Sequence, residues 1–384
     1  MKKLSIIIFF LTLILILIGL VVVLTASSSV SAMRHSDSFY LFRLHLSKVI
    51  WALPALLIAS VIPYEFYKYL SKYLMIGIVV VLFLTLFFAV EVKGAGRWIS
   101  LFGFKFQPAD AAKLFLIMHL AYLMDKKEEY LDNLYNGFLP LLIWVLIVSG
   151  LIFFQPNVSN AVLIFITSLI LIFVGGASFK HVFTTAFVFA ILAFGFAMTF
   201  SHAKERIETY VNALVTGGYV NVQVKQAIVS LGSGGVFGVG IGNSRQNNLF
   251  LPEAYGDFIF GILGEQFGLI GTLSVLLIYL FLIFSGILIA KKTYDKFGQL
   301  LAFGIITQIG LYALINIIVT VGLLPTTGLP LPFISYGGTS IIFNSIGIGI
   351  IINIAFTNYI RELERKKSGL ETIRNTNEQS AKQI

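Results

Sequence analysis

The chain of 384 residues contains no cysteine and few charged residues. Without cysteine it has no disulfide, no thiolate nucleophile and no cysteine-ligated zinc site. Only 12% of its residues are charged and 58% are hydrophobic, whereas a soluble domain is about one-quarter charged and about half apolar. A single globular core of this size cannot bury that excess of apolar side chains. The composition therefore indicates a protein whose apolar surface lies in a lipid bilayer.

Histidine is scarce too, and the basic residues do not gather in one patch. The five histidines form no HExxH or HxH pair, so we expect no metal held by several protein ligands. The net charge of +9 comes largely from short segments between apolar runs, without interleaved aromatic residues. This distribution is typical of a membrane-topology signal and argues against nucleic acid as a partner.

Ten apolar runs are long enough to cross a bilayer as helices, which takes roughly 17–25 residues. Only helices and closed barrels can span the hydrocarbon core, and these runs are far too long for barrel strands. The sequence therefore predicts an all-α integral membrane protein with about ten transmembrane helices. The predicted spans are 5–26, 47–62, 72–91, 107–124, 138–154, 160–178, 181–200, 267–290, 298–320 and 340–357.

The distribution of Lys and Arg predicts how these spans are oriented. Cytoplasmic segments carry the excess of basic residues, and this rule places both termini in the cytoplasm. Residues 1–360 are expected to form a single polytopic membrane domain, with a large extracytoplasmic loop at about 201–257 between the seventh and eighth spans. The polar segment 361–384 is expected to be a disordered cytoplasmic tail. The first apolar run is longer than a signal-peptide core, so we expect a retained helix.

The unusual sequence lies in segments that this topology places on the outer face of the membrane. Any chemistry is therefore expected to face outward, and charged residues at this boundary are candidates for function. The four outer segments are 92–113, 154–160, 201–257 and 321–340.

The segment LPEAYGDFIFGILGEQFG, residues 251–268, sets three carboxylates beside an apolar run. A helix is predicted to start just after Pro252, which places Asp257 at the outer end of a stripe of glycines that permits close helix packing. Two interpretations of Asp257 remain open: an acid that complements the helix dipole, or a partly desolvated carboxylate that acts as a general base. The residues of the stripe are Asp257, Gly261, Gly264 and Gly268.

The two other carboxylates of this segment are given different roles. Glu253 lies four residues before Asp257 on roughly the same face, so we expect it to tune Asp257 by like-charge repulsion or to bind substrate. Glu265 lies deeper and about 80° around the helix. It is expected to be a structural partner of a buried cation.

A second segment, KGAGRWISLFGFKFQPADAAKLFL at residues 93–116, gathers cations at the outer face. Gln107 and Pro108 are expected to begin a helix in which Asp110 and Lys113 pair at i,i+3 spacing. The cations are interpreted either as snorkelling anchors in the outer leaflet or as a site for phosphate or pyrophosphate. They are Lys93, Arg97, Lys105 and Lys113.

Two further outer segments are rich in glycine or proline. SLGSGGVFGVGIGNSRQ, residues 230–246, holds six glycines but no GxxxxGK[ST] motif, so it is interpreted as re-entrant backbone or as a loop that approaches a ligand. LLPTTGLPLPFISYGGTS, residues 323–340, contains too many prolines and glycines for a regular helix. Its hydroxyl groups, that of Ser335 among them, are candidates to bind a sugar, and the alternative is a rigid turn.

Four motifs in this order resemble the SEDS family (shape, elongation, division and sporulation proteins), which includes RodA and FtsW. They are GAGRWISLFGFKFQPADAAKL, SLGSGGVFGVGIGNSRQ, LPEAYGDFIFGILGEQFGLIG and GLLPTTGLPLPFISYGGTS. LTASSSVS and GNSRQNNLFLPEA resemble the FtsW branch more than RodA. The chain departs from the family pattern where Gly256 replaces a usual Thr, Asp110 a usual Glu and Asn157 a usual Asp.

This resemblance implies a peptidoglycan glycosyltransferase of the bacterial cytoplasmic membrane, which polymerises lipid II into glycan strands on the outer face in cell division or elongation. It implies a class B penicillin-binding protein as the transpeptidase partner, within the divisome or elongasome. It also implies that Asp257 is catalytic. The residues expected to bind substrate are Arg97, Lys113, Asp110, Glu253, Gln107 and Ser335.

The mechanism expected on this basis is a single inverting displacement with undecaprenyl pyrophosphate as the leaving group. No tightly bound cofactor is expected, although a divalent cation, Mg²⁺ or Mn²⁺, is compatible with the pyrophosphate. Two other functions remain open. One is a flippase or transporter of lipid-linked precursors, because spans broken by glycine and proline are transporter-like. The other is a non-catalytic scaffold for a penicillin-binding protein.

Overall fold

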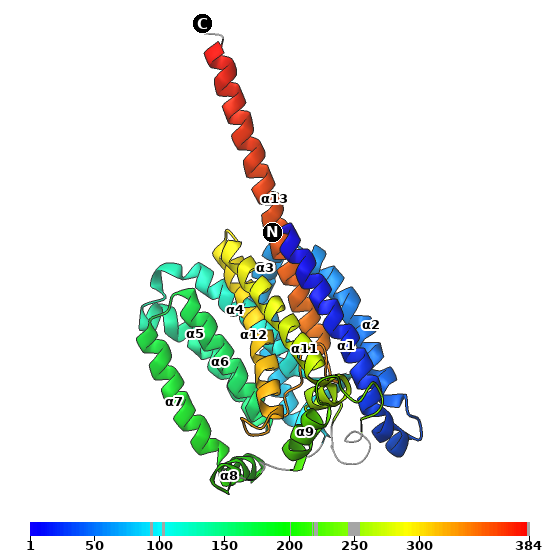
Figure 1. Ribbon diagram of the computed structural model, residues 1–384. Coiled ribbons are helices and arrows are strands. Elements are labelled where there is room, and N and C mark those ends of the chain that lie inside the picture. The colour runs from blue at the N-terminus through cyan, green and yellow to red at the C-terminus, as the bar shows by residue number, and fades with distance from the viewer. Residues whose placement is uncertain are drawn as a thin grey trace.

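The computed structural model describes residues 1–92, 95–101, 104–199, 201–216, 218, 222–244 and 254–381. The described chain is predominantly helical (Figure 1), which confirms the predicted fold class. Its long helices are α1 (Lys2–His35), α2 (Tyr40–Val61), α3 (Tyr64–Phe88), α4 (Pro108–Lys126), α5 (Leu139–Phe154), α6 (Val158–Gly175), α7 (Phe179–Ala197), α11 (Ile259–Lys292), α12 (Lys296–Thr320) and α13 (Ser340–Ala381). Two short turns of helix, η1 (Glu128–Tyr130) and η2 (Leu134–Phe138), join α4 to α5.

These ten long helices coincide with the ten predicted spans. Within the described ranges, eight of them are long and apolar enough to cross a membrane. The other two are α7, whose apolar stretch is shorter, and α4, which carries a buried charged pair in its first turns. The chain is therefore an integral membrane protein with about ten transmembrane helices.

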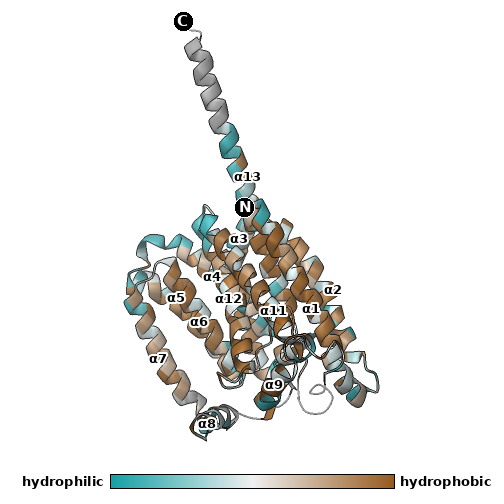
Figure 2. Ribbon diagram, viewed as in Figure 1, coloured by the Kyte–Doolittle hydropathy of each residue, from teal (hydrophilic) through white to brown (hydrophobic). Residues whose placement is uncertain are grey.

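Both ends of the chain lie at one end of the helical bundle, and α8 (Ser201–Thr216) and α9 (Val222–Ser233) lie at the other (Figure 1). Apolar residues cover the middle of the bundle, whereas hydrophilic residues gather on α8 and where α13 leaves the bundle (Figure 2). This end of α13 projects from the bundle as far as Ala381. In the structure α13 runs on through the polar segment 361–384 as far as Ala381, and the expected disorder of the tail stays a prediction. The segment continues the last span and contains no proline that would end the helix.

Before α4 the chain forms a small antiparallel sheet of three short strands. They are β1 (Val90–Val92), β2 (Ala95–Leu101) and β3 (Phe104–Phe106), arranged in the order β1-β2-β3. In the register of the last two strands, Ile99 lies opposite Phe106. Because β2 carries Arg97 and Trp98 and packs against α4, the sheet places Arg97 beside this helix.

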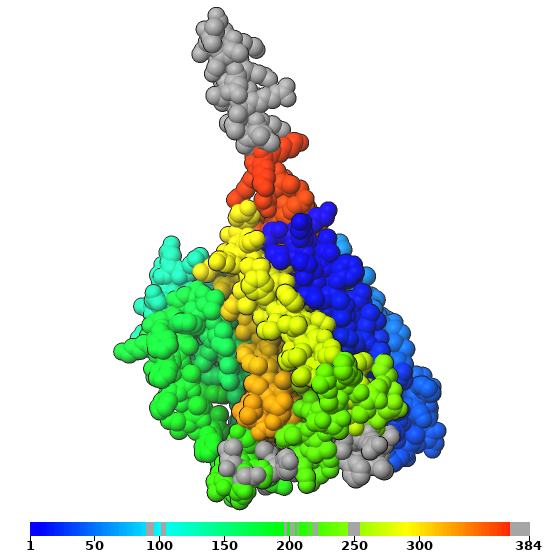
Figure 3. Space-filling model, viewed as in Figure 1, coloured from blue at the N-terminus to red at the C-terminus, as the bar shows by residue number. Residues whose placement is uncertain are grey.

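The glycine stripe of α11 packs against α9, one of two helices in a segment that the sequence predicted only as a loop. A Cβ added at Gly261 would contact Ala227 at 3.4 Å, and one added at Gly264 would lie 2.4 Å from Leu231. The stripe therefore permits the close helix packing that was predicted. In the space-filling view, the segment 222–244 covers one end of α11 beside α1 (Figure 3).

α11 is broken at Gly268, where the backbone leaves helical geometry (φ 66°, ψ −163°). The glycine-rich segment enters this break and satisfies the backbone groups on both sides of it. Non-helical backbone at membrane depth is tolerated where its polar groups are paired in this way, which supports the re-entrant interpretation. The hydrogen bonds are Leu269 N to Gly235 O (2.9 Å), Ile270 N to Val236 O (3.2 Å), Val239 N to Glu265 O (2.9 Å) and Gly240 N to Gln266 O (3.1 Å).

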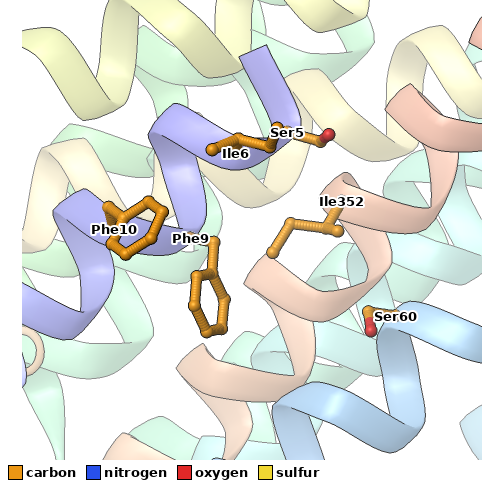
Figure 4. A pocket seen from close by; sticks show the side chains of 6 residues that line it. All are labelled: Ser5, Ile6, Phe9, Phe10, Ser60 and Ile352. Carbon is orange, nitrogen blue, oxygen red and sulfur yellow. The ribbon is translucent and has the colours of Figure 1, made fainter. Parts of the chain in front are cut away.

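Two grooves lie on the lipid-facing sides of the bundle. One of about 260 Å³ lies between α1, α2 and α13 (Figure 4), and one of about 500 Å³ lies between α3 and α5. Both are mainly apolar, and neither is lined by a predicted site residue. The first groove is lined by Ser5, Ile6, Phe9, Phe10, Ser60 and Ile352.

Candidate functional site

Asp257 lies in a turn, residues 254–258, directly before α11 begins at Ile259. The predicted helix start after Pro252 is therefore wrong, and Asp257 is not part of the helix. The reason is tertiary: three consecutive carbonyls of the turn accept hydrogen bonds from other parts of the chain. These bonds are Tyr336 N to Tyr255 O, Ser335 Oγ to Gly256 O and Asn316 Nδ2 to Asp257 O, each of 2.8 Å.

The side chain of Asp257 is half-buried and faces the α12–α13 loop (residues 321–339). Its Oδ2 lies 3.5 Å from the position that a Cβ on Gly328 would occupy, so the missing side chain leaves room beside the carboxylate. Gly328 has a φ of +72°, which glycine adopts at little cost. Asn316 links the backbone of Asp257 to that of the α12–α13 loop, because its side-chain amide donates to Asp257 O and to Leu329 O at 2.8 Å each. The backbone that carries this carboxylate is therefore held by hydrogen bonds from α12 and from the α12–α13 loop.

Asp110 and Lys113 form a buried ion pair near the start of α4. Their Oδ1 and Nζ atoms are 2.8 Å apart and each side chain is 5% exposed, which confirms the predicted i,i+3 pair. The second carboxylate oxygen accepts a hydrogen bond from the Thr339 hydroxyl (3.0 Å), and the ammonium lies 4.4 Å from the centre of the Tyr312 ring. Two desolvated charges are tolerated when further contacts of this kind compensate them.

α12 brings Asp257 and Lys113 to the same part of the molecule. Tyr312 contacts Lys113, and Asn316 contacts Asp257. These two α12 residues are four positions apart, so they share one face and are separated by about 6 Å along the helix axis. The structure therefore places the predicted base and the predicted anion-binding cation beside adjacent turns of one helix.

Arg97 reaches the turn between α5 and α6, where its guanidinium donates to Pro156 O. The same turn contains Asn157, whose Oδ1 accepts a hydrogen bond from Asn160 Nδ2 (2.9 Å). Asn160 in turn accepts a hydrogen bond from the Tyr312 hydroxyl (2.7 Å). A chain of polar side chains therefore connects the α5–α6 turn with α12. Asn157, where the family pattern has Asp, belongs to this chain.

Gln107 and Ser335, both predicted to bind substrate, hold the backbone of the site. Gln107 is the N-cap residue of α4, and its backbone N–H donates to the Thr339 hydroxyl (3.2 Å). Ser335 is 3% exposed, and its hydroxyl donates to Gly256 O and accepts from Leu331 N, both at 2.8 Å. Both residues thus join the α12–α13 loop to its neighbours, and their substrate contacts stay predictions.

Glu265 is buried deeper in α11, with 1% of its surface exposed. Its Oε2 lies 3.0 Å from the Ser230 hydroxyl and accepts a hydrogen bond from the Ser244 hydroxyl. These contacts join α11 to the glycine-rich segment, as a structural residue would, and the cation partner stays a prediction. Glu253 and Lys93 lie outside the described residues, so their expected roles also stay predictions.

Tyr312 and Asn316 are site residues that sequence reasoning missed. A signal existed for Asn316, because an amide inside the predicted span 298–320 is costly unless it is paired. The ring of Trp98 covers the α12–α13 loop. A Cβ added at Gly338 would lie 2.1 Å from the Trp98 ring. Over the described ranges, no group of three His, Asp or Glu side chains is placed to hold a metal ion.

Comparison with known proteins gives a family match over most of the chain. Residues 5–360 match the FtsW/RodA/SpoVE family model, described as a cell cycle protein. A probable peptidoglycan glycosyltransferase FtsW of Geobacter metallireducens is 33% identical over 339 residues, which cover 88% of this chain and 90% of the relative.

Two solved structures share the fold at 22% sequence identity. A chain of a peptidoglycan synthase complex, described as coordinating polymerization and crosslinking, matches with a TM-score of 0.73 and covers 92% of this chain and 97% of its own. The rod shape determining protein RodA of Thermus thermophilus matches with a TM-score of 0.68 and covers 92% of this chain and 96% of its own. The matched motifs, the family model and the shared fold agree, and the chain therefore belongs to the FtsW/RodA/SpoVE family, as an FtsW-like member of the SEDS proteins.

Proposed function

We propose that this protein is a peptidoglycan glycosyltransferase that polymerises lipid II into glycan strands on the outer face of the cytoplasmic membrane. Family membership and the activity named for its FtsW relative support this function. The observation that carries it is the placement of Asp257 and of the Asp110–Lys113 pair beside adjacent turns of α12. A carboxylate and a buried cation at one membrane boundary suit the transfer of a sugar from an anionic lipid carrier.

Asp257 serves as the general base in this proposal. Its carboxylate takes the proton from the 4-hydroxyl of the acceptor's N-acetylglucosamine, and that oxygen attacks C1 of the donor's N-acetylmuramic acid. The bond between C1 and the pyrophosphate oxygen breaks, and undecaprenyl pyrophosphate leaves with the electron pair. A single displacement inverts the anomeric carbon, so an α-linked donor gives a β-linked glycan. One carboxylate suffices because pyrophosphate is a good leaving group, whereas glycoside hydrolysis uses a pair.

Lys113 and Arg97 are proposed to stabilise the charge that develops on the leaving pyrophosphate. Lys113 is fixed by Asp110 and by the face of Tyr312, and Arg97 extends from β2 toward the α5–α6 turn. Charge stabilisation by fixed groups of this kind costs little reorganisation during the reaction. A divalent cation bound to the phosphates, Mg²⁺ or Mn²⁺, would add to it.

A class B penicillin-binding protein is the proposed partner and would crosslink the new strands. Support comes from the fold shared with a chain of a peptidoglycan synthase complex. We place the end of the bundle that carries α8 and α9 outside and both termini in the cytoplasm, as the distribution of basic residues favours. The FtsW-like sequence favours a role in cell division.

The test of this function is reconstitution of the full-length protein in vesicles with a class B penicillin-binding protein and labelled lipid II. We expect glycan polymer without net movement of the labelled lipid across the bilayer. Lipid movement without polymer would contradict the proposal and indicate a flippase. The absence of both polymer and lipid movement would contradict the proposal and indicate a non-catalytic scaffold.

A further inference from the structure

Lys48 is a cation of α2 that the proposed mechanism does not use. It is half-buried, and its Nζ donates to Gly337 O at 3.3 Å. The same ammonium lies 4.8 Å from the centre of the Tyr336 ring. Both partners belong to the α12–α13 loop. One side chain from a different helix therefore holds two consecutive residues of that loop.

The loop residues next to this contact hold the turn that carries Asp257. Tyr336 N donates to Tyr255 O, and Ser335 Oγ donates to Gly256 O, each at 2.8 Å. The two residues directly before Asp257 are thus bonded to two consecutive loop residues, one of which lies under the Lys48 ammonium. A shift of this part of the loop is therefore expected to shift the carboxylate as well.

The Tyr336 ring lies between the Lys48 side chain and the turn that carries Asp257. It packs edge-on against Tyr255 (ring centres 5.3 Å apart, 84° between planes) and lies 5.8 Å from the ring of His45, which is on the same helix as Lys48. Burial raises the pKa of Tyr336 to about 12, so the ring stays a neutral phenol at neutral pH. The face of a neutral phenol ring attracts an ammonium.

The inward direction of Lys48 needs a cause, because a lysine near the end of a membrane helix ordinarily extends into water. Here Asp110 attracts the ammonium and Lys105 repels it. An ammonium has three N–H donors, and over the described part of the chain Gly337 O is the single hydrogen-bond acceptor it reaches. The free-energy cost of desolvating this charge is offset by its hydrogen bond to Gly337 O and its contact with the Tyr336 ring.

We propose that Lys48 is a positioning residue for Asp257 and acts through Tyr336 and Gly337. The inference rests on the proposed function, in which Asp257 is the general base. A base must lie within hydrogen-bond reach of the hydroxyl that it deprotonates, and a misplacement of about 1 Å can cost a hundredfold in rate. Because Lys48 is not assigned a substrate contact, its loss is expected to lower kcat and to leave KM unchanged.

The test is steady-state polymerisation of lipid II by the full-length Lys48→Met variant. Met keeps an unbranched side chain but removes the charge and the donors. We expect kcat to fall about tenfold to a hundredfold with KM as in wild type, and we expect Lys48→Arg to restore most of the loss. The matched control is Arg43→Met on the same helix, whose exposed guanidinium pairs with Asp37. It should behave like wild type.

Two results would overturn the inference: wild-type kcat in Lys48→Met, or a raised KM at unchanged kcat, which would assign Lys48 to substrate binding. If Lys48→Met does not fold, Lys48→Leu, which also lacks the charge and the donors, is measured with the same two criteria. Asp257→Asn, assayed in parallel, separates the two proposals. An inactive Asp257→Asn beside a normal Lys48→Met refutes only the role of Lys48, whereas an active Asp257→Asn refutes the general base itself.

Discussion

At the scale of single residues, the Asp110–Lys113 pair shows how charge is held inside this bundle. Each carboxylate oxygen has a partner, Lys113 for Oδ1 and Thr339 for Oδ2. The ammonium is placed between the carboxylate and the face of Tyr312. A buried pair of this kind contributes little net stability, but the loss of one partner leaves an uncompensated charge.

The Lys113→Met variant should therefore be destabilised by about 3–5 kcal/mol and should lose polymerase activity. Combining Lys113→Met with Asp110→Asn removes both charges, so we expect much of the stability to return while activity stays low. Thermal unfolding and lipid II polymerisation of the single and double variants measure both effects. Recovery of activity in the double variant would show that the pair has only a structural role.

Asn316 gives a second prediction, because one amide group donates to two carbonyls beside the base. Asn316→Ala leaves Asp257 O and Leu329 O without this donor, at about 1–3 kcal/mol for each unsatisfied group. We expect a lower melting temperature and a lower kcat. Leu314→Ala is the control on the same helix, since Leu314 is 51% exposed. An unchanged melting temperature in Asn316→Ala would contradict the bridging role.

At the scale of elements, the break in α11 decides how the glycine-rich segment packs. A Cβ at Gly268 would lie 2.4 Å from Gly238 N, and the φ of +66° is strained for any other residue. Gly268→Ala should therefore destabilise the protein by at least about 1 kcal/mol and loosen the glycine-rich segment. Limited proteolysis of the segment and thermal unfolding measure this.

Gly150→Ala in α5 is the matched control for this prediction. A Cβ at Gly150 meets nothing within 4 Å, and Ala is a better helix former than Gly by about 1 kcal/mol. We expect neutral or slightly raised stability. Equal behaviour of the two variants would contradict the account of the break.

The elements that the sequence predicted correctly are those fixed by local pattern. The ten spans follow from apolar length, the start of α4 follows from Gln107 and Pro108, and the Asp110–Lys113 pair follows from i,i+3 spacing. The start of α11 and its break at Gly268 depend on hydrogen bonds from residues far away in the sequence. The periodicity of a single sequence does not show which distant residues form these hydrogen bonds. Tyr312 could not be predicted for the same reason, because its contact with Lys113 joins two different helices.

At the scale of the whole molecule, the proposed topology puts α8 and α9 outside and both termini inside. The absence of cysteine makes single-cysteine labelling unambiguous. A cysteine at Val215, which is 81% exposed on α8, should react with a membrane-impermeant maleimide in intact cells. A cysteine at Glu129, in the η1 turn near the start of α12, should react only after the membrane is opened. The reverse pattern would invert the proposed orientation.

If the Asp257 carboxylate is the base of a glycosyl transfer, an amide in its place should abolish polymerisation without unfolding the protein. Purified full-length wild type, Asp257→Asn and Asp257→Glu are given lipid II, and the glycan product is quantified beside the melting temperature of each protein. We expect no detectable polymer from Asp257→Asn at an unchanged melting temperature, and partial activity from Asp257→Glu, which retains a carboxylate at a longer reach. Wild-type polymerisation by Asp257→Asn would show that Asp257 is not the base.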